Sequence, residues 1–478
     1  MRHEISLAVN GRVETVDGLA PHTTLLNWLR ARGQTSVKEG CAEGDCGACT
    51  VMVGTPKKSG GFDWRATCSC ILTVPQLDGS AVITAEGLRG ADGTHHPAQT
   101  LMAEGGGTQC GFCSPGFVMA LANMSRRPER DDETILDAIS GNLCRCTGYR
   151  PIIDAARAMP VVAAPAEESK LAADLAKTTI EGLDYAGDGG RFIAPNDLEG
   201  ALAARVAHPD AWILAGGTDL GLRITKRHEV PKALLWLGRI AALKTIAETP
   251  AGLTIGAGAT YEDALPMMER LHPELASLVR RIGGAQIRSV GTVGGNLGNA
   301  SPIGDSMPAL IALSAEVEIA GPGGRRRRVP VEDFITGYRK TVLAADELIF
   351  AVHIPKPHKD ASFHTYKVAR RIDQDISAVC AAFRVRVENG TVVEAVSGWG
   401  GVAARPLRGR AWEAAIKGKP WSRATIEAAK NALLASDVTP ISDFRAGADY
   451  RRAVCEGLVD RLWHEISGDV PAASLEAV

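Results

Sequence analysis

The chain has 478 residues and a formal net charge of −2, and 45% of its residues are hydrophobic. This length exceeds what one core usually supports and predicts about three domains. The near-neutral charge argues against nucleic acid or a membrane surface as the main partner, and no apolar run approaches the ~20 residues of a membrane helix. The eleven cysteines, most of them in the first third, follow no secretory signal, which favours reduced thiols and a cytoplasmic protein.

The first 87 residues are expected to form a small mixed sheet with one helix. Residues 4–16 alternate as two strands around an Asn-Gly turn, and the leucines within 25–29 give a short helical face. A glycine-rich loop with three cysteines follows this helix. Residues 82–84 are then typical of another strand.

The next region, up to about residue 160, has a helical character. Apolar residues within 117–124 predict one helix, and those within 135–139 predict another that follows the capping-type residues Asp131 and Asp132. Pro151 is suited to the first turn of a third helix, because its missing N–H is not needed there.

The remaining two thirds of the chain change character twice. Residues 161–190 have no convincing apolar period and are expected to be a linker. Residues 191–360 indicate an α/β region. Beyond residue 361, strands at 379–387 and 392–397 precede a helical tail, which predicts an antiparallel sheet with helices packed on one face.

The first cysteine set is Cys41-x4-Cys46-x2-Cys49, the spacing of plant-type [2Fe–2S] ferredoxins. A zinc site or plain buried cysteines are the alternatives, but zinc ribbons favour C-x2-C pairs. A cluster needs a fourth thiolate, and both Cys68 and Cys70 lie on the segment that should supply it. If that segment is a strand, both side chains point to the same face. The residues alone leave this choice open.

The second set is Cys110-x2-Cys113 followed by Cys144-x-Cys146. Each pair precedes an expected helix, and a thiolate at a helix N-terminus gains from the positive end of the dipole. Alone, this spacing also suits zinc. Beside a ferredoxin-type loop it favours a second [2Fe–2S] centre.

Two glycine-rich segments are candidates for a flavin site. No G-x-G-x-x-G follows a strand, which disfavours a Rossmann dinucleotide site. Instead, an expected strand at 213–215 leads into Gly216-Gly217-Thr218, whose amides can cradle a pyrophosphate. Residues 289–299 offer a second amide-rich loop. Each signal is weak by itself, because glycine-rich turns are usually only turns.

Longer motifs resemble a known family. GCAEGDCGACTV, TQCGFCSPGFVMA and GNLCRCTGYRPI resemble the iron–sulfur domains of the xanthine dehydrogenase/aldehyde oxidase family of molybdenum hydroxylases. The two glycine-rich segments resemble the family's FAD domain, and the match extends through FITGYRKT and YKVARR. DQDIS continues it into the domain that follows the flavin domain. The resemblance covers nearly the whole chain and is closest to the small subunit of bacterial members, which carries both clusters and FAD.

The resemblance implies a multidomain α+β fold. Its expected parts are a β-grasp ferredoxin-like domain at 1–87, an all-α four-helix iron–sulfur domain at 88–160, a linker at 161–190, an α/β FAD-binding domain at 191–360 and a C-terminal flavoprotein domain at 361–478, an antiparallel sheet with helices.

The resemblance also implies the roles of individual residues. In the family the fourth ligand of the first cluster is a Cys before Leu or Ile, matching Cys70-Ile71, and Asn stands where this chain has Cys68. Gln109 matches a glutamine that contacts the pterin on the partner chain. The FAD-binding residues implied are Ile213, Leu214, Ala215, Gly216, Gly217, Thr218, Asp219, Leu220, Ile282, Thr292, Val293, Gly294, Gly295, Asn296, Asp305, which binds ribose, and Lys367.

The implied function is electron transfer during oxidation of hypoxanthine and xanthine to urate. Electrons pass from molybdenum through the second cysteine set, the first set and FAD to NAD. No part of the chain resembles the molybdenum domain, so a large partner subunit is expected, in an α2β2 heterotetramer, and no catalytic acid, base or nucleophile on this chain. The alternatives are the small subunit of an aldehyde or nicotinate dehydrogenase, or a free-standing electron carrier.

Several remaining features are interpreted as structural. Trp399 is expected to fill core rather than to pack on the flavin. The basic run Arg325 to Arg328 is expected to be a solvated hairpin. His95-His96 is expected to be a structural loop pair, and the isolated Cys380 and Cys455 are expected to be buried.

Overall fold

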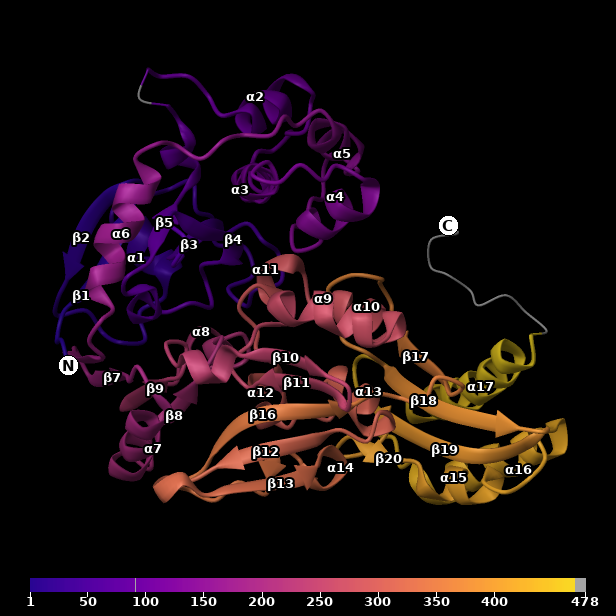
Figure 1. Ribbon diagram of the computed structural model, residues 1–478. Coiled ribbons are helices and arrows are strands. Elements are labelled where there is room, and N and C mark those ends of the chain that lie inside the picture. Colours follow the sequence, from indigo (N-terminus) through magenta and orange to yellow (C-terminus); the bar gives the residue numbers. More distant parts are fainter. Residues whose placement is uncertain (91, 469–478) are drawn as a thin grey trace. The chain divides into compact units, whose positions relative to one another are not determined.

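The computed structural model describes residues 1–90 and 92–468 and divides them between two compact units (Figure 1). Unit 1 contains Met1–Leu243, Thr260–Asp263 and Ile282–Thr292. Unit 2 contains the rest of the chain, from Lys244 onward. Within the described ranges, no helix combines the length and apolar character that crossing a membrane requires.

Unit 1 begins with a five-stranded sheet in the order β2-β1-β5-β3-β4. Its strands are β1 Ile5–Val9, β2 Arg12–Val16, β3 Thr50–Pro56, β4 Phe62–Cys68 and β5 Ala81–Ile83. The pair β1/β5 is parallel and the other pairs are antiparallel. Helix α1 (Leu25–Ala31) is capped by Thr24, whose hydroxyl accepts from the Asn27 amide, and buries its leucines in the core beside the sheet. The hairpin and the helix lie where the sequence predicts them.

Four helices follow: α2 Pro97–Glu104, α3 Ser114–Met124, α4 Asp132–Ile139 and α5 Arg150–Arg157. Helix α3 is buried along most of its length and packs against α2 and α4. The predicted cap of α4 is confirmed, because Asp131 accepts from the Thr134 amide at 2.9 Å. His96 caps α2 through Nδ1, which accepts from the Ala98 amide at 3.1 Å. His96 is therefore structural, as expected.

The segment 161–190, expected to be a linker, is itself folded. It carries α6 (Glu168–Thr178) and β6 (Leu183–Gly187). Helix α6 buries only Ala172 and Leu175, so its apolar signal in the sequence is faint. Glu168 adds polar anchors, accepting from Trp64 Nε1 at 2.8 Å and pairing with Arg126 at 2.9 Å.

Unit 1 ends with a four-stranded sheet in the order β6-β7-β9-β8. Strand β9 pairs in parallel with both β7 and β8. The elements not yet given are β7 Gly190–Ala194, β8 Trp212–Leu214, β9 Ala233–Trp236, α7 Leu198–Ala207, α8 Leu220–Thr225, α11 Ala285–Arg288 and the short 3-10 helices Val74–Leu77 and Ala85–Leu88.

Unit 2 contains an antiparallel sheet in the order β10-β11-β16-β12-β13. Its strands are β10 Ile246–Thr249, β11 Gly252–Gly256, β12 Glu316–Ala320, β13 Arg326–Pro330 and β16 Leu348–Pro355. The neighbouring elements are α9 Tyr261–Leu271, which begins in unit 1, α10 Pro273–Arg280, α12 Val293–Asn299, α13 Ser306–Ala312, α14 Val331–Phe334, β14 Ile335–Gly337, β15 Lys340–Thr341 and the 3-10 helices Ala241–Lys244 and Pro322–Gly324. The basic run lies on the exposed hairpin β12/β13, where Arg326 and Arg327 pair with Glu318 and Glu347.

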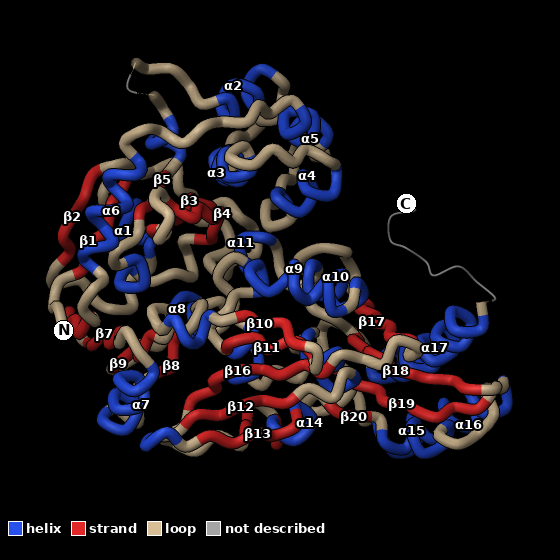
Figure 2. The backbone as a smooth tube through the Cα atoms, in the orientation of Figure 1, coloured by secondary structure: helices blue, strands red, loops and turns tan. Residues whose placement is uncertain are grey.

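The last sheet has the order β17-β18-β19-β20 (Figure 2). Its strands are β17 Ser362–Val368, β18 Val379–Glu388, β19 Thr391–Gly400 and β20 Leu407–Arg408, and its helices are α15 Arg410–Ile416, α16 Arg423–Ala432, the π-helix Leu433–Asp437 and α17 Ala448–Ser467. Trp399 is fully buried among the helices, with its ring 5.1 Å from that of Phe383. The core interpretation of Trp399 is confirmed. Cys380 and Cys455 are buried, also as expected.

A helix from outside this region covers the other face of this sheet, which the sequence did not predict. Side chains alternate along β19, so Gly398 and Trp399 point to opposite faces. Helix α13 occupies the glycine face so closely that a Cβ at Gly398 would lie 2.1 Å from the carbonyl oxygen of Pro308. The reason it escapes prediction is that α13 comes from the preceding α/β region, about 90 residues earlier in the chain.

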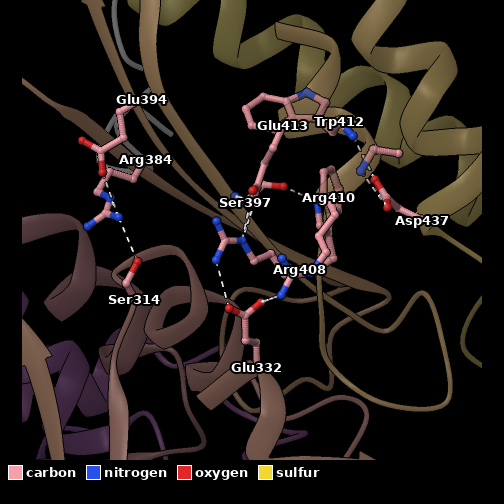
Figure 3. A network of polar contacts seen from close by, with 12 residues as sticks. Ser314, Glu332, Arg384, Glu394, Ser397, Arg408, Arg410, Trp412, Glu413 and Asp437 are labelled. Atoms are coloured by element: carbon pink, nitrogen blue, oxygen red, sulfur yellow. Dashed lines mark hydrogen bonds and ion pairs between the residues drawn. The ribbon is translucent and has the colours of Figure 1, made fainter. Parts of the chain in front are cut away.

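A polar network ties α14 to the last sheet and its helices (Figure 3). The Glu332 carboxylate of α14 binds Arg408 at 2.9 Å and Arg410 at 3.0 Å. Arg408 also binds Glu413 at 2.9 Å, and these hydrogen bonds raise the pKa of Arg408 above its usual value. Glu332 and Glu413 are mostly shielded from water, so screening weakens these pairs less than surface pairs.

We predict that Glu332→Gln destabilises unit 2. The amide cannot balance the charge of Arg408, and losing a charged hydrogen bond typically costs about 1–3 kcal/mol. Urea unfolding should show a lower midpoint for one transition. Asp174→Asn, which breaks an exposed pair with Lys177 in unit 1, should leave both transitions unchanged. Equal midpoints for Glu332→Gln and the wild type would contradict the prediction.

Candidate metal centres and cofactor loops

The first cysteine set lies in one loop and one turn of unit 1. Cys41, Cys46 and Cys49 occupy the irregular loop between α1 and β3, and Cys70 follows the end of β4. The Cys41 sulfur accepts hydrogen bonds from the amides of Glu43 (3.4 Å), Asp45 (3.3 Å) and Cys46 (3.3 Å). Several amides pointing at one atom form a concavity suited to an anion. The loop therefore favours a thiolate at position 41.

The four thiols contact one another. Hydrogen bonds from Cys46 and then Cys70 lower the pKa of Cys41, and bonds from Cys68 and Cys70 lower that of Cys49. The partner thiols show the opposite shift, since the bond to Cys41 raises the pKa of both Cys46 and Cys70. Thiols packed this closely cannot all ionise unless a cation joins them, and metal binding displaces such protons.

The geometry distinguishes Cys70 from Cys68. Cys70 bonds to both Cys41 and Cys49. Cys68 bonds to Cys49 and donates its S–H to the Gly44 carbonyl at 3.6 Å. Strand β4 ends at Cys68, so strand alternation does not extend to Cys70. This arrangement favours Cys70 as the fourth ligand.

Two further contacts restrict the conformation of this loop. A Cβ at Gly40 would lie 2.7 Å from the Cys46 sulfur, so glycine is needed for the loop to close around the thiols. Lys226 donates to the Cys41 carbonyl at 3.0 Å and pairs with Glu43 at 3.5 Å. Lys226 places a positive charge beside the thiols, and the sequence alone gives no signal for it.

The second cysteine set lies among the four helices. Cys110 and Cys113 occupy the turn before α3, with Cys113 at its N-cap, and Cys144 and Cys146 lie between α4 and α5. The thiols bond in two pairs, Cys110 with Cys146 and Cys113 with Cys144. Burial and then the bond to Cys144 raise the pKa of Cys113 to about 12.

Cys144 is held as a hydrogen-bond acceptor. Its sulfur accepts from the amides of Cys146 and Thr147, both at 3.4 Å, and lies 3.2 Å from the Thr147 hydroxyl. Burial opposes ionisation, but the Thr147 and Cys146 bonds outweigh it and lower the pKa of Cys144. Its own amide donates to the Tyr149 hydroxyl at 2.9 Å.

The thiol contacts suit a two-iron cluster, whose four thiolates are shared between two irons with two on each. The second set gives two such pairs. In the first set the contacts Cys41–Cys46 and Cys49–Cys70 are accompanied by a third, Cys41–Cys70, which brings all four thiols together. Across residues 1–90 and 92–468, no group of three or more His, Cys, Asp and Glu side chains meets the requirements of a metal-ion site.

Part of the candidate flavin set lies in unit 1. Ile213 and Leu214 end β8, the loop 215–219 follows, and Leu220 begins α8. A Cβ at Gly216 would lie 1.9 Å from the Val290 carbonyl oxygen, and Gly217 has φ +83°, so both positions require glycine. Ile282 and Thr292 flank α11 in the same unit.

The other candidate flavin residues lie in unit 2. Val293 to Asn296 form the first turn of α12, and the amides of Val293 and Gly294 bond to Ala259 and Ala257. A Cβ at Gly294 would lie 2.4 Å from the Cβ of Ala257. These two amides are therefore engaged with the backbone, and the expectation of a donor loop does not hold for them. They hold the turn close to its neighbouring strand.

Asp305 and Lys367 form a buried ion pair of 2.8 Å in unit 2. The second oxygen of Asp305 accepts from the Ser377 hydroxyl at 2.6 Å, and Lys367 also donates to the Arg281 carbonyl at 2.7 Å. The sequence analysis missed Ser377 and Arg281 because they come from distant segments. The pair fixes both charged groups in place before any ligand binds.

Family models match the parts of the chain that contain these residues. Four family models match in chain order: the 2Fe-2S iron–sulfur cluster binding domain (7–73), the [2Fe-2S] binding domain (84–157), the FAD binding domain in molybdopterin dehydrogenase (187–357) and the CO dehydrogenase flavoprotein C-terminal domain (364–466). The chain thus contains two [2Fe–2S]-binding domains and an FAD-binding domain.

The similar proteins include curated relatives and solved structures. Xanthine dehydrogenase 1 of Arabidopsis thaliana is 30% identical over 98% of this chain and 40% of its own length. Among solved structures, carbon monoxide dehydrogenase from Hydrogenophaga pseudoflava is 30% identical, covers 56% of this chain and 94% of that chain, and has a TM-score of 0.54. Quinoline 2-oxidoreductase from Pseudomonas putida 86 is 26% identical, covers 57% of this chain and 95% of that one, and has a TM-score of 0.53.

The chain spans about two fifths of the length of the curated xanthine dehydrogenases it matches. The matched part contains the iron–sulfur and flavin domains. On the sequence motifs, the paired thiols and these matches, the chain belongs to the xanthine dehydrogenase/carbon monoxide dehydrogenase family of molybdenum hydroxylases, as an electron-transfer [2Fe–2S]/FAD region.

Proposed function

We propose that this chain is the small, electron-transfer subunit of a bacterial xanthine dehydrogenase that oxidises hypoxanthine and xanthine to urate and reduces NAD. The observation that carries the proposal is the presence, in one chain, of two complete four-cysteine sets followed by the FAD-binding domain. Similarity to xanthine dehydrogenases over nearly the whole chain supports the substrate class.

The two cysteine sets are the proposed cluster ligands. Cys41, Cys46, Cys49 and Cys70 hold one [2Fe–2S] cluster, and Cys110, Cys113, Cys144 and Cys146 hold the other. When bound, the clusters supply single-electron steps, and FAD converts these into the two-electron reduction of NAD. The chain's contribution is to bring the thiols of each set together, to direct amides at the sulfurs of Cys41 and Cys144, and to bury Cys49, Cys70 and Cys144.

The exposed end of the second cysteine set supports the proposal that a partner chain covers it. Cys110, Cys146 and Gln109 are exposed, and so is Phe112, at 48%. A large apolar side chain beside reactive thiols is an unfavourable free surface and a suitable docking point. We propose that a large molybdenum-cofactor subunit covers it, with Gln109 at the pterin, in an α2β2 heterotetramer.

The proposed flavin site uses the residues of both glycine-rich segments, with Asp305 at the ribose. Gly216 and Gly217 allow close backbone approach, and the buried Asp305–Lys367 pair keeps a carboxylate oriented without ordering it on binding. The proposed set is the loop Ile213–Leu220 with Ile282, Thr292–Asn296, Asp305 and Lys367.

A different substrate is the second candidate. Carbon monoxide dehydrogenase and quinoline 2-oxidoreductase match more than half of this chain, 56% and 57%, at 30% and 26% identity. Under this proposal the substrate pocket lies on the partner, so the small subunit of another molybdenum hydroxylase would have the same electron-transfer sites. The two candidates differ only in the substrate that reduces the assembled enzyme.

The assembled enzyme gives a direct test. We expect the chain, purified from its source, to carry a molybdenum-containing partner, about four irons and one FAD per copy by the ligand count of two [2Fe–2S] centres, and to form NADH with xanthine. Activity with carbon monoxide, quinoline or an aldehyde but not xanthine would favour the second candidate. A colourless protein that binds zinc and no flavin would contradict both.

Single cysteine changes test the fourth ligand. We predict that Cys70→Ser removes or alters the EPR signal of one cluster, because Cys70 contacts both Cys41 and Cys49. Cys68→Ser is the matched control and should leave both signals and the iron content unchanged. The reverse pattern would assign the ligand to Cys68.

Lys367→Met tests the flavin proposal. Without its cation, the buried Asp305 carboxylate is uncompensated and loses its fixed orientation. We expect the purified variant to contain less FAD and to bind added FAD more weakly, measured by flavin fluorescence. Lys356→Met, at an exposed lysine of the same unit, should retain full FAD. Full occupancy in Lys367→Met would refute the assignment.

A further inference from the structure

A buried chain of side-chain amides joins the two cysteine-bearing regions of unit 1. Asn142 Nδ2 donates to the Gly47 carbonyl at 3.0 Å and to the Thr50 hydroxyl at 3.3 Å. Gln286 Nε2, from α11, donates to Asn142 Oδ1 at 2.7 Å. Gln286 is fully buried, Asn142 is 4% exposed and Thr50 is 2% exposed, so water does not compete for these bonds.

The chain of amides connects the loops at their cysteines. Gly47 lies between Cys46 and Cys49 of the first set, and Asn142 lies two residues before Cys144 of the second. The Thr50 hydroxyl donates to the same Gly47 carbonyl at 2.6 Å, so this oxygen receives two side-chain donors. Asn142 therefore holds the backbone of one cysteine loop from within the other.

Glycines allow the two regions to touch but do not hold them in register. A Cβ at Gly47 would lie 2.1 Å from the Gly141 carbonyl oxygen, and one at Gly116 would lie 2.2 Å from the Gly47 carbonyl oxygen. One backbone hydrogen bond joins the two regions directly, from the Leu143 amide to the Cys46 carbonyl at 3.0 Å. Hydrogen bonds are directional, so the two that the Asn142 side chain donates further restrict how the loops can shift about this single bond.

The Gln286 side chain supports this interpretation, because its burial carries an energetic penalty. Its Oε1 is buried and has no hydrogen-bond partner in the described structure, which is unfavourable. The donor Nε2, by contrast, makes the shortest of the three side-chain amide hydrogen bonds, to Asn142 at 2.7 Å. The Gln286 side chain is thus placed for its bond to Asn142 and not for general stability.

We propose that Asn142 is a positioning residue that fixes the distance and orientation between the Cys41/Cys46/Cys49/Cys70 set and the Cys110/Cys113/Cys144/Cys146 set. The inference rests on the proposed function, in which each set holds a cluster. Electronic and magnetic coupling between two centres falls steeply with their separation. A residue that holds both loops therefore controls the coupling while leaving each cluster's own ligands unchanged.

The test uses the full-length, cluster-loaded chain, with both clusters reduced by dithionite. Two nearby paramagnetic centres split each other's EPR lines, and this splitting reports their separation. We expect Asn142→Ala to narrow or smear the splitting, while the iron content and the signal of each cluster taken alone persist. Thr50→Val should have a weaker effect in the same direction, and Thr50→Ser should restore the wild-type splitting.

Asn123→Ala is the matched control. Asn123 lies near the C-terminal end of α3, in the same helical region as Asn142. Wild-type splitting in this variant, together with altered splitting in Asn142→Ala, supports the proposal.

Three results would overturn it. Unchanged splitting in Asn142→Ala shows that other contacts fix the loops. Loss of iron from Asn142→Ala and Thr50→Val alike shows that the amides serve cluster assembly and not spacing. A wild-type chain without two cluster signals refutes the proposed function itself. This result differs from failure of the Asn142 proposal, because it is seen without any variant.

Discussion

Thiolates buried side by side are stable only where N–H groups and cations offset their charge. In the first set, three backbone amides point at the Cys41 sulfur and Lys226 binds the carbonyl of the same residue. In the second set, two amides serve Cys144. The surrounding fold follows from this demand, because amides converge on one atom only in a tight loop, and such a loop needs neighbours that prevent its collapse.

In unit 2, a buried carboxylate is balanced by the side chain of a lysine. Asp305 and Lys367 are buried together, and each uses its remaining hydrogen-bonding capacity on Ser377 or on the Arg281 carbonyl. A buried ion pair gains little net stability, because desolvation offsets most of the attraction, but it holds charged groups in one orientation. The Glu332 network does the same between α14 and the last sheet, at a lower degree of burial. In both places the ion pairs fix the orientation of charged groups and add little net stability. The stability comes from apolar burial, as in the aromatic core around Trp399.

The comparisons and the geometry address different questions. Family matches account for two cluster-binding domains and a flavin-binding domain, and the chain spans about two fifths of the length of the xanthine dehydrogenases it matches. The geometry adds what domain matches do not contain: which sulfurs touch, which of two neighbouring cysteines bonds to both Cys41 and Cys49, and how one loop holds the other. A domain match names a cofactor, but the contacts determine how its site is built.

The sequence by itself determined the local features: the hairpin at residues 4–16, the Asp131 cap, the buried Trp399 and the two cysteine sets, because spacing, capping and alternation are properties of neighbouring residues. Residue spacing left Cys68 and Cys70 equivalent and the family resemblance pointed to Cys70, which the tertiary structure also favours through its bonds to Cys41 and Cys49. The tertiary structure alone placed Lys226, Ser377 and Gln286, which lie roughly 70 to 185 residues from the groups they contact. It also revealed that segment 161–190 is folded and that α13 covers the second face of the last sheet. Burial against a distant element leaves no hydrophobic period in the sequence.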